Sequence, residues 1–362
     1  MAERGNRALR LVDRTVGVFL VLCLSVLARH RSLPSRPNRI GVLCLGAIGD
    51  FLLLSAAVRD LQRSIDGCDV VIIGSADNRA AAALVPDIPF VAIPATNPIR
   101  AARVVRRLGF DLIIDSSQWA RLPAVICAVS GAPSVGFRTA GQGRHFAYAA
   151  CVDHSRLHHE LDNFRNLMSG FAQPTDRVPT IEVSDEDRAA VGSVDAARYA
   201  VFHAWPSGVK AHLKEWPTEH WIRLAEAIEG LGMPVVLTGG KQDQLRSERL
   251  AGALNKVATV VDLAGQLTLR ETAAVLEGAA VTISVNTGIM HIAACFDTPL
   301  VALCGPTDPA RWGPLSGHAR VPVPKSAGCW NLHLGFEYHE ESAACMASID
   351  PDEVAAQVEA LL

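Results

Sequence analysis

The 362-residue sequence lacks several features that would place a chain in a class at once. It has no Cys-x-x-Cys pair, no short repeat and no excess of basic residues, since 34 Lys and Arg stand against 37 Asp and Glu. With a formal net charge of −3, a nucleic acid is excluded as the main partner. The composition, 49% hydrophobic and 20% charged, is typical of a globular chain, and the length suffices for two domains.

The nine cysteines follow no zinc-binding pattern. Their number is odd and most lie inside apolar runs, where cysteine behaves as a small buried hydrophobe. Free thiols in a reducing cytosol are therefore the simplest expectation. Cys329 and Cys345 flank His333 and His339, but this spacing fits no standard zinc site. We accordingly predict no metal.

An uncharged run near the N-terminus, residues 15–28, has arginines on both sides. Its 14 residues are fewer than the ~20 that span a bilayer comfortably, and the basic flank after it argues against a cleaved signal peptide. We expect residues 1–37 to form a membrane-associating helix and a linker, with the helix on the cytoplasmic face of the cell membrane. The alternative is a helix that packs on the protein's own surface.

Apolar runs typical of buried strands alternate with helical patterns along the rest of the chain. These runs cover residues 39–45, 70–74, 90–93 and 111–115, and then residues 199–203, 234–240, 280–284 and 299–304. Such alternation predicts parallel, doubly wound sheets. We therefore predict an α/β chain with two Rossmann-like domains, residues 38–180 and 181–345, followed by a C-terminal helix over residues 346–362.

The turn after the first predicted strand contains Gly46, Gly49 and Asp50. The glycines let a substrate approach the backbone closely, and the carboxylate stands at the start of the next helix. A carboxylate in that position can act as a general base that removes a proton from a sugar hydroxyl. It can equally be a helix cap that only satisfies backbone amides. Both interpretations stay open at this point.

Two loops in the second half carry further candidates. Lys210 and Lys214 follow the strand at residues 199–203, and a lysine amine can neutralise a diphosphate. The Trp-Pro dipeptide shortly after Lys214 anchors its loop, which favours Lys214. Thr238 and Gly239 then form the exit of the next strand.

The most informative stretch is residues 285–291, Val-Asn-Thr-Gly-Ile-Met-His. It follows a buried strand and turns into a helix, which leaves backbone N–H groups at the sheet edge where open α/β sheets bind phosphorylated ligands. Thr287 offers a hydroxyl, Gly288 offers an N–H without a side chain, and His291 falls one turn later on the same helix face. The alternative for His291 is a buried histidine that helps to hold the loop.

Together these segments resemble glycosyltransferase family 9, the ADP-heptose:lipopolysaccharide heptosyltransferases. The matching stretches are residues 40–50, 214–217, 238–240, 262–265, 286–291, 305–309 and 345–354. The resemblance implies a GT-B fold, two Rossmann-like domains facing a cleft, with the acceptor on the first domain and the sugar nucleotide on the second. It also implies inverting transfer with no metal or other cofactor.

The same resemblance assigns roles to residues. Asp50 is the base, Gly46 and Gly49 form the acceptor-side turn, and Lys214 contacts the diphosphate. The residues expected to bind the donor are Lys214, Thr238, Gly239, Asn286, Thr287, Gly288 and His291. Two positions depart from the usual family pattern. Asn286 stands where an aspartate is usual, which keeps the size but loses the charge, and Ala47 stands where a serine is common.

The sequence therefore predicts a glycosyltransferase at the inner face of the cell membrane. It would transfer heptose from ADP-heptose to a lipopolysaccharide core or a related glycan. The expected partners are a nucleotide sugar, a glycolipid or polysaccharide acceptor, and the membrane surface. One alternative is a sugar-nucleotide epimerase on the same fold, against which Asn286 argues because that reaction needs well-placed acids. The other alternative is a glycan- or nucleotide-binding scaffold that has lost turnover.

Overall fold

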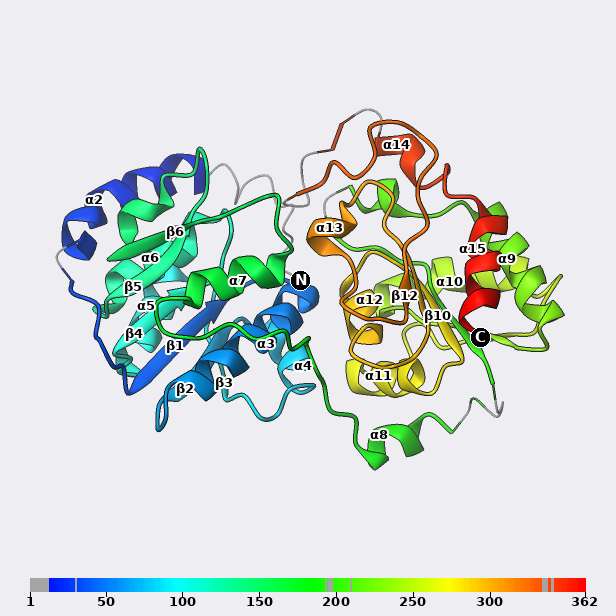
Figure 1. Cartoon of the computed structure of the whole chain (residues 1–362), viewed down its shortest axis with the longest axis horizontal. Helices are drawn as coiled ribbons and strands as arrows, with labels where there is room; N and C mark the ends of the chain where they lie inside the picture. The colour runs from blue at the N-terminus through cyan, green and yellow to red at the C-terminus, as the bar shows by residue number, and fades with distance from the viewer. Residues whose placement is uncertain are drawn as a thin grey trace. The chain divides into compact units, whose positions relative to one another are not determined.

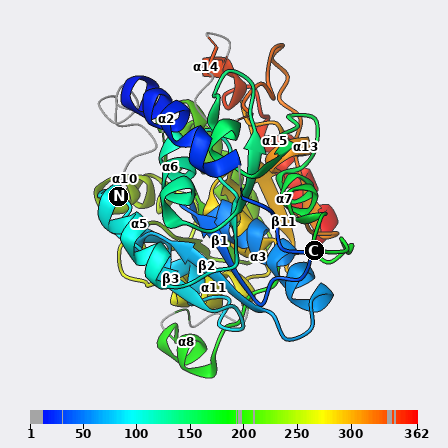
Figure 2. The same ribbon diagram turned by 90° about the vertical axis from the view of Figure 1, so that its left-hand side faces the viewer.

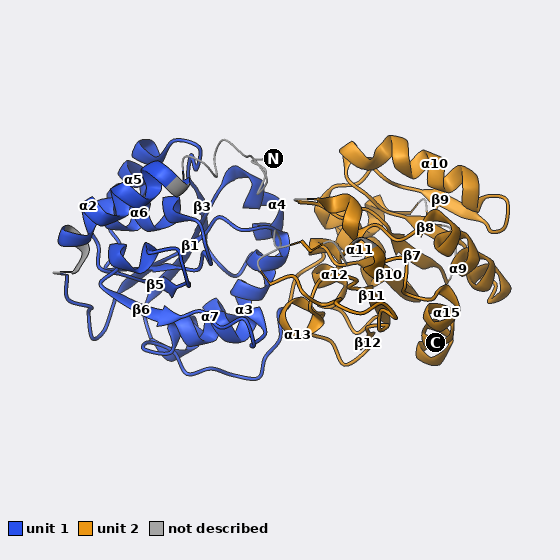
Figure 3. Ribbon diagram, turned by 90° about the horizontal axis from the view of Figure 1, so that it is seen from above, with its two compact units in different colours: residues 1–179 blue, residues 180–362 orange. Residues whose placement is uncertain are grey.

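The computed structural model describes residues 13–29, 31–192, 194, 198–208, 210–333, 338–339 and 342–362. The chain divides into two compact units, Met1–Pro179 and Thr180–Leu362 (Figure 1 and Figure 3). Each unit contains one six-stranded sheet, and the pairings between its described strands are parallel. The α/β class and the doubly wound sheets predicted from the sequence are confirmed.

The first unit has the strand order β3-β2-β1-β4-β5-β6. Its strands are β1 (Arg39–Cys44), β2 (Asp69–Gly74), β3 (Phe90–Ala92), β4 (Leu112–Asp115), β5 (Ser134–Arg138) and β6 (Ala150–Asp153). Its helical segments are η1 (Asp13–Gly17), α2 (Val18–Arg29), α3 (Ile48–Ser64), η2 (Ala76–Asn78), α4 (Arg79–Ala82), α5 (Pro98–Arg107), α6 (Arg121–Ser130), η3 (Arg144–Ala147) and α7 (Glu160–Met168). The chain leaves β1 toward β3 and later returns to β4 on the other side of β1. The carboxyl ends of β1 and β4 therefore mark the switch point, where such sheets bind ligands.

The second unit repeats this topology with the order β12-β11-β10-β7-β8-β9. Its strands are β7 (Ala200–His203), β8 (Val235–Leu237), β9 (Val260–Asp262), β10 (Val281–Val285), β11 (Leu300–Leu303) and β12 (Ala319–Arg320). Its helical segments are α8 (Asp185–Ala190), η4 (Ala211–Lys214), α9 (Thr218–Gly230), η5 (Lys241–Asp243), α10 (Gln244–Leu254), α11 (Leu269–Glu277), α12 (Gly288–Ala293), α13 (Pro309–Trp312), α14 (Ser342–Cys345) and α15 (Pro351–Leu361). The switch point here lies between β7 and β10.

The central strands are continuous apolar runs because helices cover both faces of a parallel sheet. In β2, for example, every residue after Asp69 is buried. Several helices begin at a side chain that caps them. The Asn97 side chain accepts the N–H of Arg100 at the start of α5, and the Thr268 side chain accepts the N–H of Glu271 at the start of α11. In the second unit α15 packs against α9, and Trp216 donates its indole N–H to the carbonyl of Ile349 at 3.1 Å.

The uncharged run near the N-terminus forms η1 and α2, and α2 packs on α6 and η3 of the first unit. Val21 is buried in this contact, whereas Phe19 on another side of α2 is 67% exposed. In the described part of the chain, no helix is both long enough and apolar enough to cross a membrane. Residues 1–12 of the predicted membrane-associating segment lie outside the described residues.

A disulfide joins Cys329 to Cys345, so the prediction of free thiols is wrong for this pair. The other seven cysteines are free. The sequence spacing of the two cysteines does not predict this disulfide, because tertiary contacts of the loop between them bring the two residues together. In that loop, Asn331 and Leu332 donate their backbone N–H groups to the carbonyl of Pro306 at 2.9 and 3.0 Å. The bridge therefore closes a segment that is fastened to the loop after β11.

Candidate active site

Asp50 lies in the first turn of α3, directly after the carboxyl end of β1, and is 5% exposed. Its Oδ2 accepts the backbone N–H of Ala47 at 2.8 Å. Its Oδ1 accepts the side-chain amide of Gln118, which follows β4, at 3.0 Å. The carboxylate thus caps its own helix and also accepts a hydrogen bond from the loop after β4, on the other side of the switch point. Capping alone does not account for the second bond.

The turn that holds Asp50 has little freedom. A Cβ added to Gly46 would lie 2.8 Å from the Cβ of Asp50, so only glycine lets the carboxylate fold back over this turn. The side-chain amide of Asn78 donates to the carbonyl of Gly46 at 2.9 Å from the loop after β2. Gly49 is buried inside α3. Loops after β2 and β4 therefore fasten the predicted acceptor-side turn from separate strands.

Gln118 is itself held by a buried polar network. Its carbonyl accepts the hydroxyl of Thr139, and the nearby guanidinium of Arg144 donates to Asp115 Oδ2 at 2.6 Å. Burial raises the pKa of Tyr148 well above its ordinary value, so its hydroxyl stays protonated and donates to Asp115 at 2.6 Å. Gln118 was not among the predicted site residues. The signal that could have found it is the polar run after the strand at 112–115, since Asp50 also follows the end of a predicted strand.

Asn286 follows β10, and its side-chain amide is used inside the protein. The amide donates to the carbonyl of Trp312 in α13 at 3.1 Å. It also lies 3.9 Å from the sulfur of Cys304, a thiol whose pKa burial raises to about 12. An aspartate has no hydrogen to donate here and would set its charge against the Trp312 carbonyl. The asparagine, which departs from the usual family residue, therefore fits its surroundings.

The next residues form the start of the short helix α12. The hydroxyl of Thr287 accepts the backbone N–H of Ile289 at 3.2 Å and so caps the helix that begins at Gly288. His291, one turn further, is 7% exposed, and its backbone carbonyl accepts the thiol of Cys295 at 3.2 Å. The structure thus brings the four predicted residues 286, 287, 288 and 291 together at one edge of the second sheet.

Thr238 follows β8, which is separated from β10 by β7. Its hydroxyl is 3.0 Å from Nδ1 of His203, the last residue of β7, and both side chains are buried. Burial lowers the pKa of His203 to about 4, so this imidazole is neutral near pH 7. At Gly239, an added Cβ would lie 2.7 Å from the ring of Trp205, so only glycine fits there. His203 was not predicted as a site residue, although its place at a strand end was visible in the sequence.

Both lysines considered from the sequence contact other groups of the second unit. Lys214, in η4, donates its amine to the carbonyl of Ser207 at 3.0 Å and so closes its own loop. The amine of Lys210 lies 5.8 Å from the ring centre of Tyr338. Lys214 remains the predicted diphosphate contact.

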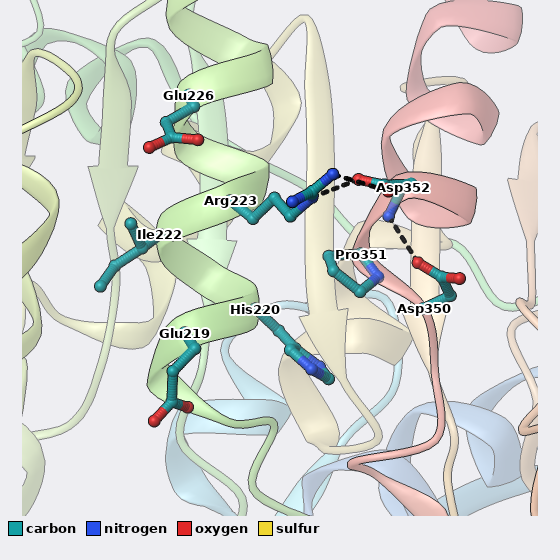
Figure 4. A pocket seen from close by; sticks show the side chains of 8 residues that line it. All are labelled: Glu219, His220, Ile222, Arg223, Glu226, Asp350, Pro351 and Asp352. Atoms are coloured by element: carbon teal, nitrogen blue, oxygen red, sulfur yellow. Dashed lines mark hydrogen bonds and ion pairs between the residues drawn. The ribbon is translucent and has the colours of Figure 1, made fainter.

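A surface pocket of the second unit lies away from these turns, between α9 and the start of α15 (Figure 4). Two of its charged groups pair with each other, and a third pairs with a lysine outside the lining. Arg223 donates to Asp352 at 2.5 and 2.9 Å, and Asp350 accepts the amine of Lys325 at 2.5 Å. None of the predicted site residues lines this pocket, so it is not a candidate for the active site.

Comparisons with known proteins identify the family and the fold. Residues 99–328, more than half of the chain, match the sequence pattern of "Glycosyltransferase family 9 (heptosyltransferase)". Lipopolysaccharide heptosyltransferase 1 of Pseudomonas aeruginosa is 29% identical over 280 residues, which cover 71% of this chain and 75% of that protein.

Solved structures show the same fold at low identity. The E. coli ADP-heptose LPS heptosyltransferase II superposes with a TM-score of 0.72 at 22% identity, covering 89% of this chain and 98% of that one. The E. coli heptosyltransferase WaaC, solved with ADP, gives a TM-score of 0.68 at 19% identity over 90% of this chain and all of that one. Both matches identify the fold as GT-B-like. With the match to the family pattern, they lead to the conclusion that this chain is an enzyme of glycosyltransferase family 9.

Proposed function

We propose that this enzyme is an inverting heptosyltransferase that uses ADP-heptose and a lipopolysaccharide core or a related glycan. Membership in the family supports sugar transfer, and the similarity to lipopolysaccharide and ADP-heptose heptosyltransferases supports heptose, ADP-heptose and lipopolysaccharide as the substrates to test first. The observation that carries the proposal is Asp50, a buried carboxylate held at the switch point of the first sheet by Ala47 and Gln118.

The transfer needs one proton acceptor on the acceptor side. The acceptor hydroxyl oxygen forms a bond to the anomeric carbon while the bond from that carbon to the diphosphate oxygen breaks, and attack from the opposite side inverts the configuration. The hydroxyl proton passes to the carboxylate of Asp50. Because two hydrogen bonds already fix the orientation of this carboxylate, the reaction pays little entropy to align it with the acceptor hydroxyl.

The donor side must stabilise a departing diphosphate. We assign this role to the amine of Lys214, together with the hydroxyl of Thr287 and the backbone N–H of Gly288. His291 and the Thr238–Gly239 exit complete the nucleotide-sugar site. The neutral side chains of Asn286 and His203 add no negative charge near this anion.

A donor screen tests the proposal most directly. Purified protein is incubated with a panel of sugar nucleotides and with extracted glycolipids that lack outer sugars, and the products are weighed by mass spectrometry. The expected result is growth of a glycolipid by one heptose with ADP-heptose alone. Transfer only from another donor would overturn the heptose assignment. Conversion of a sugar nucleotide without change of mass would indicate an epimerase, and calorimetric binding without transfer would indicate a scaffold.

We also propose that the enzyme works at the inner face of the cell membrane. A lipopolysaccharide acceptor is anchored by its lipid, so an enzyme on the bilayer surface meets it at high local concentration. Fractionation of cells with intact membranes tests this. Full-length protein found entirely in the supernatant at low salt would contradict it.

A further inference from the structure

Helix α2 turns apolar side chains outward. Phe19, Leu22 and Val26 share one stripe of the helix and are 67%, 51% and 66% exposed. Val21 lies on another side, is 1% exposed and packs into the core of the first unit. A surface helix usually shows polar residues to solvent. In the described residues, α2 therefore carries one covered apolar side and one uncovered apolar side.

Helix α5 adds positive charge to the same layer. Both α2 and α5 pack against α6, and the three helices face the viewer in Figure 2. The buried side of α5 is apolar, and its exposed side carries Arg100, Arg103, Arg106 and Arg107. The sequences of α2, α5 and α6 contain no acidic residue, although the whole chain has a net charge of −3.

Arg31 follows α2, and its guanidinium donates to the carbonyl of Ala132, just after α6, at 3.0 Å. Burial and the positive charge of Arg106 lower the pKa of Arg31. Among the described residues, Arg31 and the four arginines of α5 make no ion pair with a carboxylate. The single acid of η1, Asp13, is bound to Arg121 at 3.0 Å. This concentration of uncompensated charge favours an anionic partner.

Exposed apolar side chains gather in the same layer. Of the thirteen large apolar side chains that are exposed in the described chain, seven lie on η1, α2, α5 and α6. They are Val16, Phe19, Leu20, Leu22, Val26, Ile99 and Val129. We call these seven residues, together with Arg31 and the four arginines of α5, the outer helix face.

We propose that the outer helix face is a docking surface for an anionic lipid bilayer. The stripe of α2 enters the boundary between headgroups and acyl chains, and the arginines of α5 contact lipid phosphates. This inference goes beyond attachment through the first 37 residues, because α5 and α6 lie outside that segment and the whole layer takes part. It does not depend on which sugar the enzyme transfers.

A second copy of the chain is the less favourable occupant. A symmetric dimer sets the same patch against itself, so the five arginines would approach the equivalent five with no carboxylate from these helices between them. A bilayer that contains acidic phospholipids matches both the charge and the apolar stripe.

The test is vesicle sedimentation with the full-length protein. Vesicles of phosphatidylcholine alone are compared with vesicles that also contain phosphatidylglycerol. We expect strong binding only to the second kind, weakened but not abolished by high salt. The double variant Phe19→Asp/Leu22→Asp should lose about tenfold or more in vesicle affinity. The quadruple change of the α5 arginines to serine should lower binding to the level seen with phosphatidylcholine.

Two control variants carry the same change in net charge as the two test variants, but at exposed positions outside the outer helix face. The first is Leu157→Asp/Leu245→Asp, at side chains that are 82% and 72% exposed elsewhere. The second converts four other exposed arginines to serine, namely Arg156, Arg198, Arg249 and Arg320. Both controls should bind vesicles like the wild type. All variants should retain turnover on a soluble acceptor analogue, so a failure of docking is distinguishable from a failure of the proposed reaction.

Three results would overturn the proposal. They are equal binding to both kinds of vesicle, face variants that bind no worse than their controls, and a dimer in ultracentrifugation that Phe19→Asp/Leu22→Asp dissolves. The last result would assign the face to a second copy of the chain.

Discussion

The turn after β1 and the turn after β10 occupy related places in two sheets of the same topology, yet they carry opposite chemistry. In the first unit the turn holds a carboxylate, Asp50, closed in by a backbone N–H and by Gln118. In the second unit the turn holds the neutral Asn286, whose amide binds the carbonyl of Trp312. One fold therefore places a carboxylate at one switch point and a neutral amide at the other. This difference matches the two roles that we propose, proton acceptor for the first turn and diphosphate binding for the second.

Among the variants that test the difference between the two turns, Asp50→Asn is expected to have the largest effect on turnover. Asparagine keeps the shape but cannot accept the acceptor's proton, so turnover should fall by about 10²–10⁴-fold. Donor binding, measured by calorimetry, should stay close to the wild-type value because the proposed donor residues belong to the second unit.

Asp350→Asn is a matched control for this change. Asp350 caps α15 by accepting the N–H of Asp352 at 3.0 Å, and asparagine can cap equally well, so both stability and turnover should stay close to the wild-type values. Near-normal turnover of Asp50→Asn would show that Asp50 is only a helix cap and that the two turns do not differ in chemistry.

A pH effect is expected from His203, beside the neutral turn. Burial lowers its pKa from 6.5 to about 4, so the unfolded chain binds a proton that the folded chain does not bind between these values. Stability from this group is complete above pH 6.5 and is lost as the pH falls toward 4, by at most about 3 kcal/mol. Urea unfolding of the wild type and of His203→Gln at several pH values measures the difference. Equal pH slopes for the two proteins would contradict a buried neutral histidine.

Much of this contrast was visible in the sequence. The apolar runs that form β1, β2, β4, β7 and β10 were predicted because buried parallel strands are continuous and hydrophobic. The short strands β6, β9 and β12 were not predicted. Two to four residues at a sheet edge carry too little pattern, and their pairing comes from tertiary contacts.

What the sequence could not show is which side chains meet. Gln118 lies 68 residues from Asp50, and only the strand order sets β4 beside β1. The amide of Asn286 reaches Trp312 across 26 residues, so its departure from the family pattern could be noticed but not explained. The candidate turns were therefore predictable, whereas the bonds that fix them depend on topology. The roles of the site residues stay predictions.

Asn286→Asp places a carboxylate in the second turn, as in the first. We expect a moderate loss of stability and of donor affinity. The hydrogen bond to Trp312 disappears and a carboxylate faces that carbonyl, which should cost about 1–3 kcal/mol in urea unfolding. The added charge should also weaken donor affinity in calorimetry. Gln244→Glu, an exposed change at the start of α10, adds the same charge as a control. Unchanged stability with higher turnover would mean that the donor turn accepts an acid, as the usual family pattern implies.

The smallest effect is expected from Gln118→Ala, which tests how firmly the first turn must be held. Gln118 touches the carboxylate of Asp50, whereas Asn78 holds the same turn only through the carbonyl of Gly46. If orientation of the carboxylate limits the reaction, Gln118→Ala should lower kcat by about tenfold and leave the KM for the donor unchanged. Asn78→Ala should change kcat less, because the two bonds from Gln118 and Ala47 remain. Steady-state kinetics of both variants measures this split. Equal losses would mean that the turn needs general rigidity, and an unchanged kcat in Gln118→Ala would show that the backbone N–H of Ala47 positions Asp50 sufficiently without the amide.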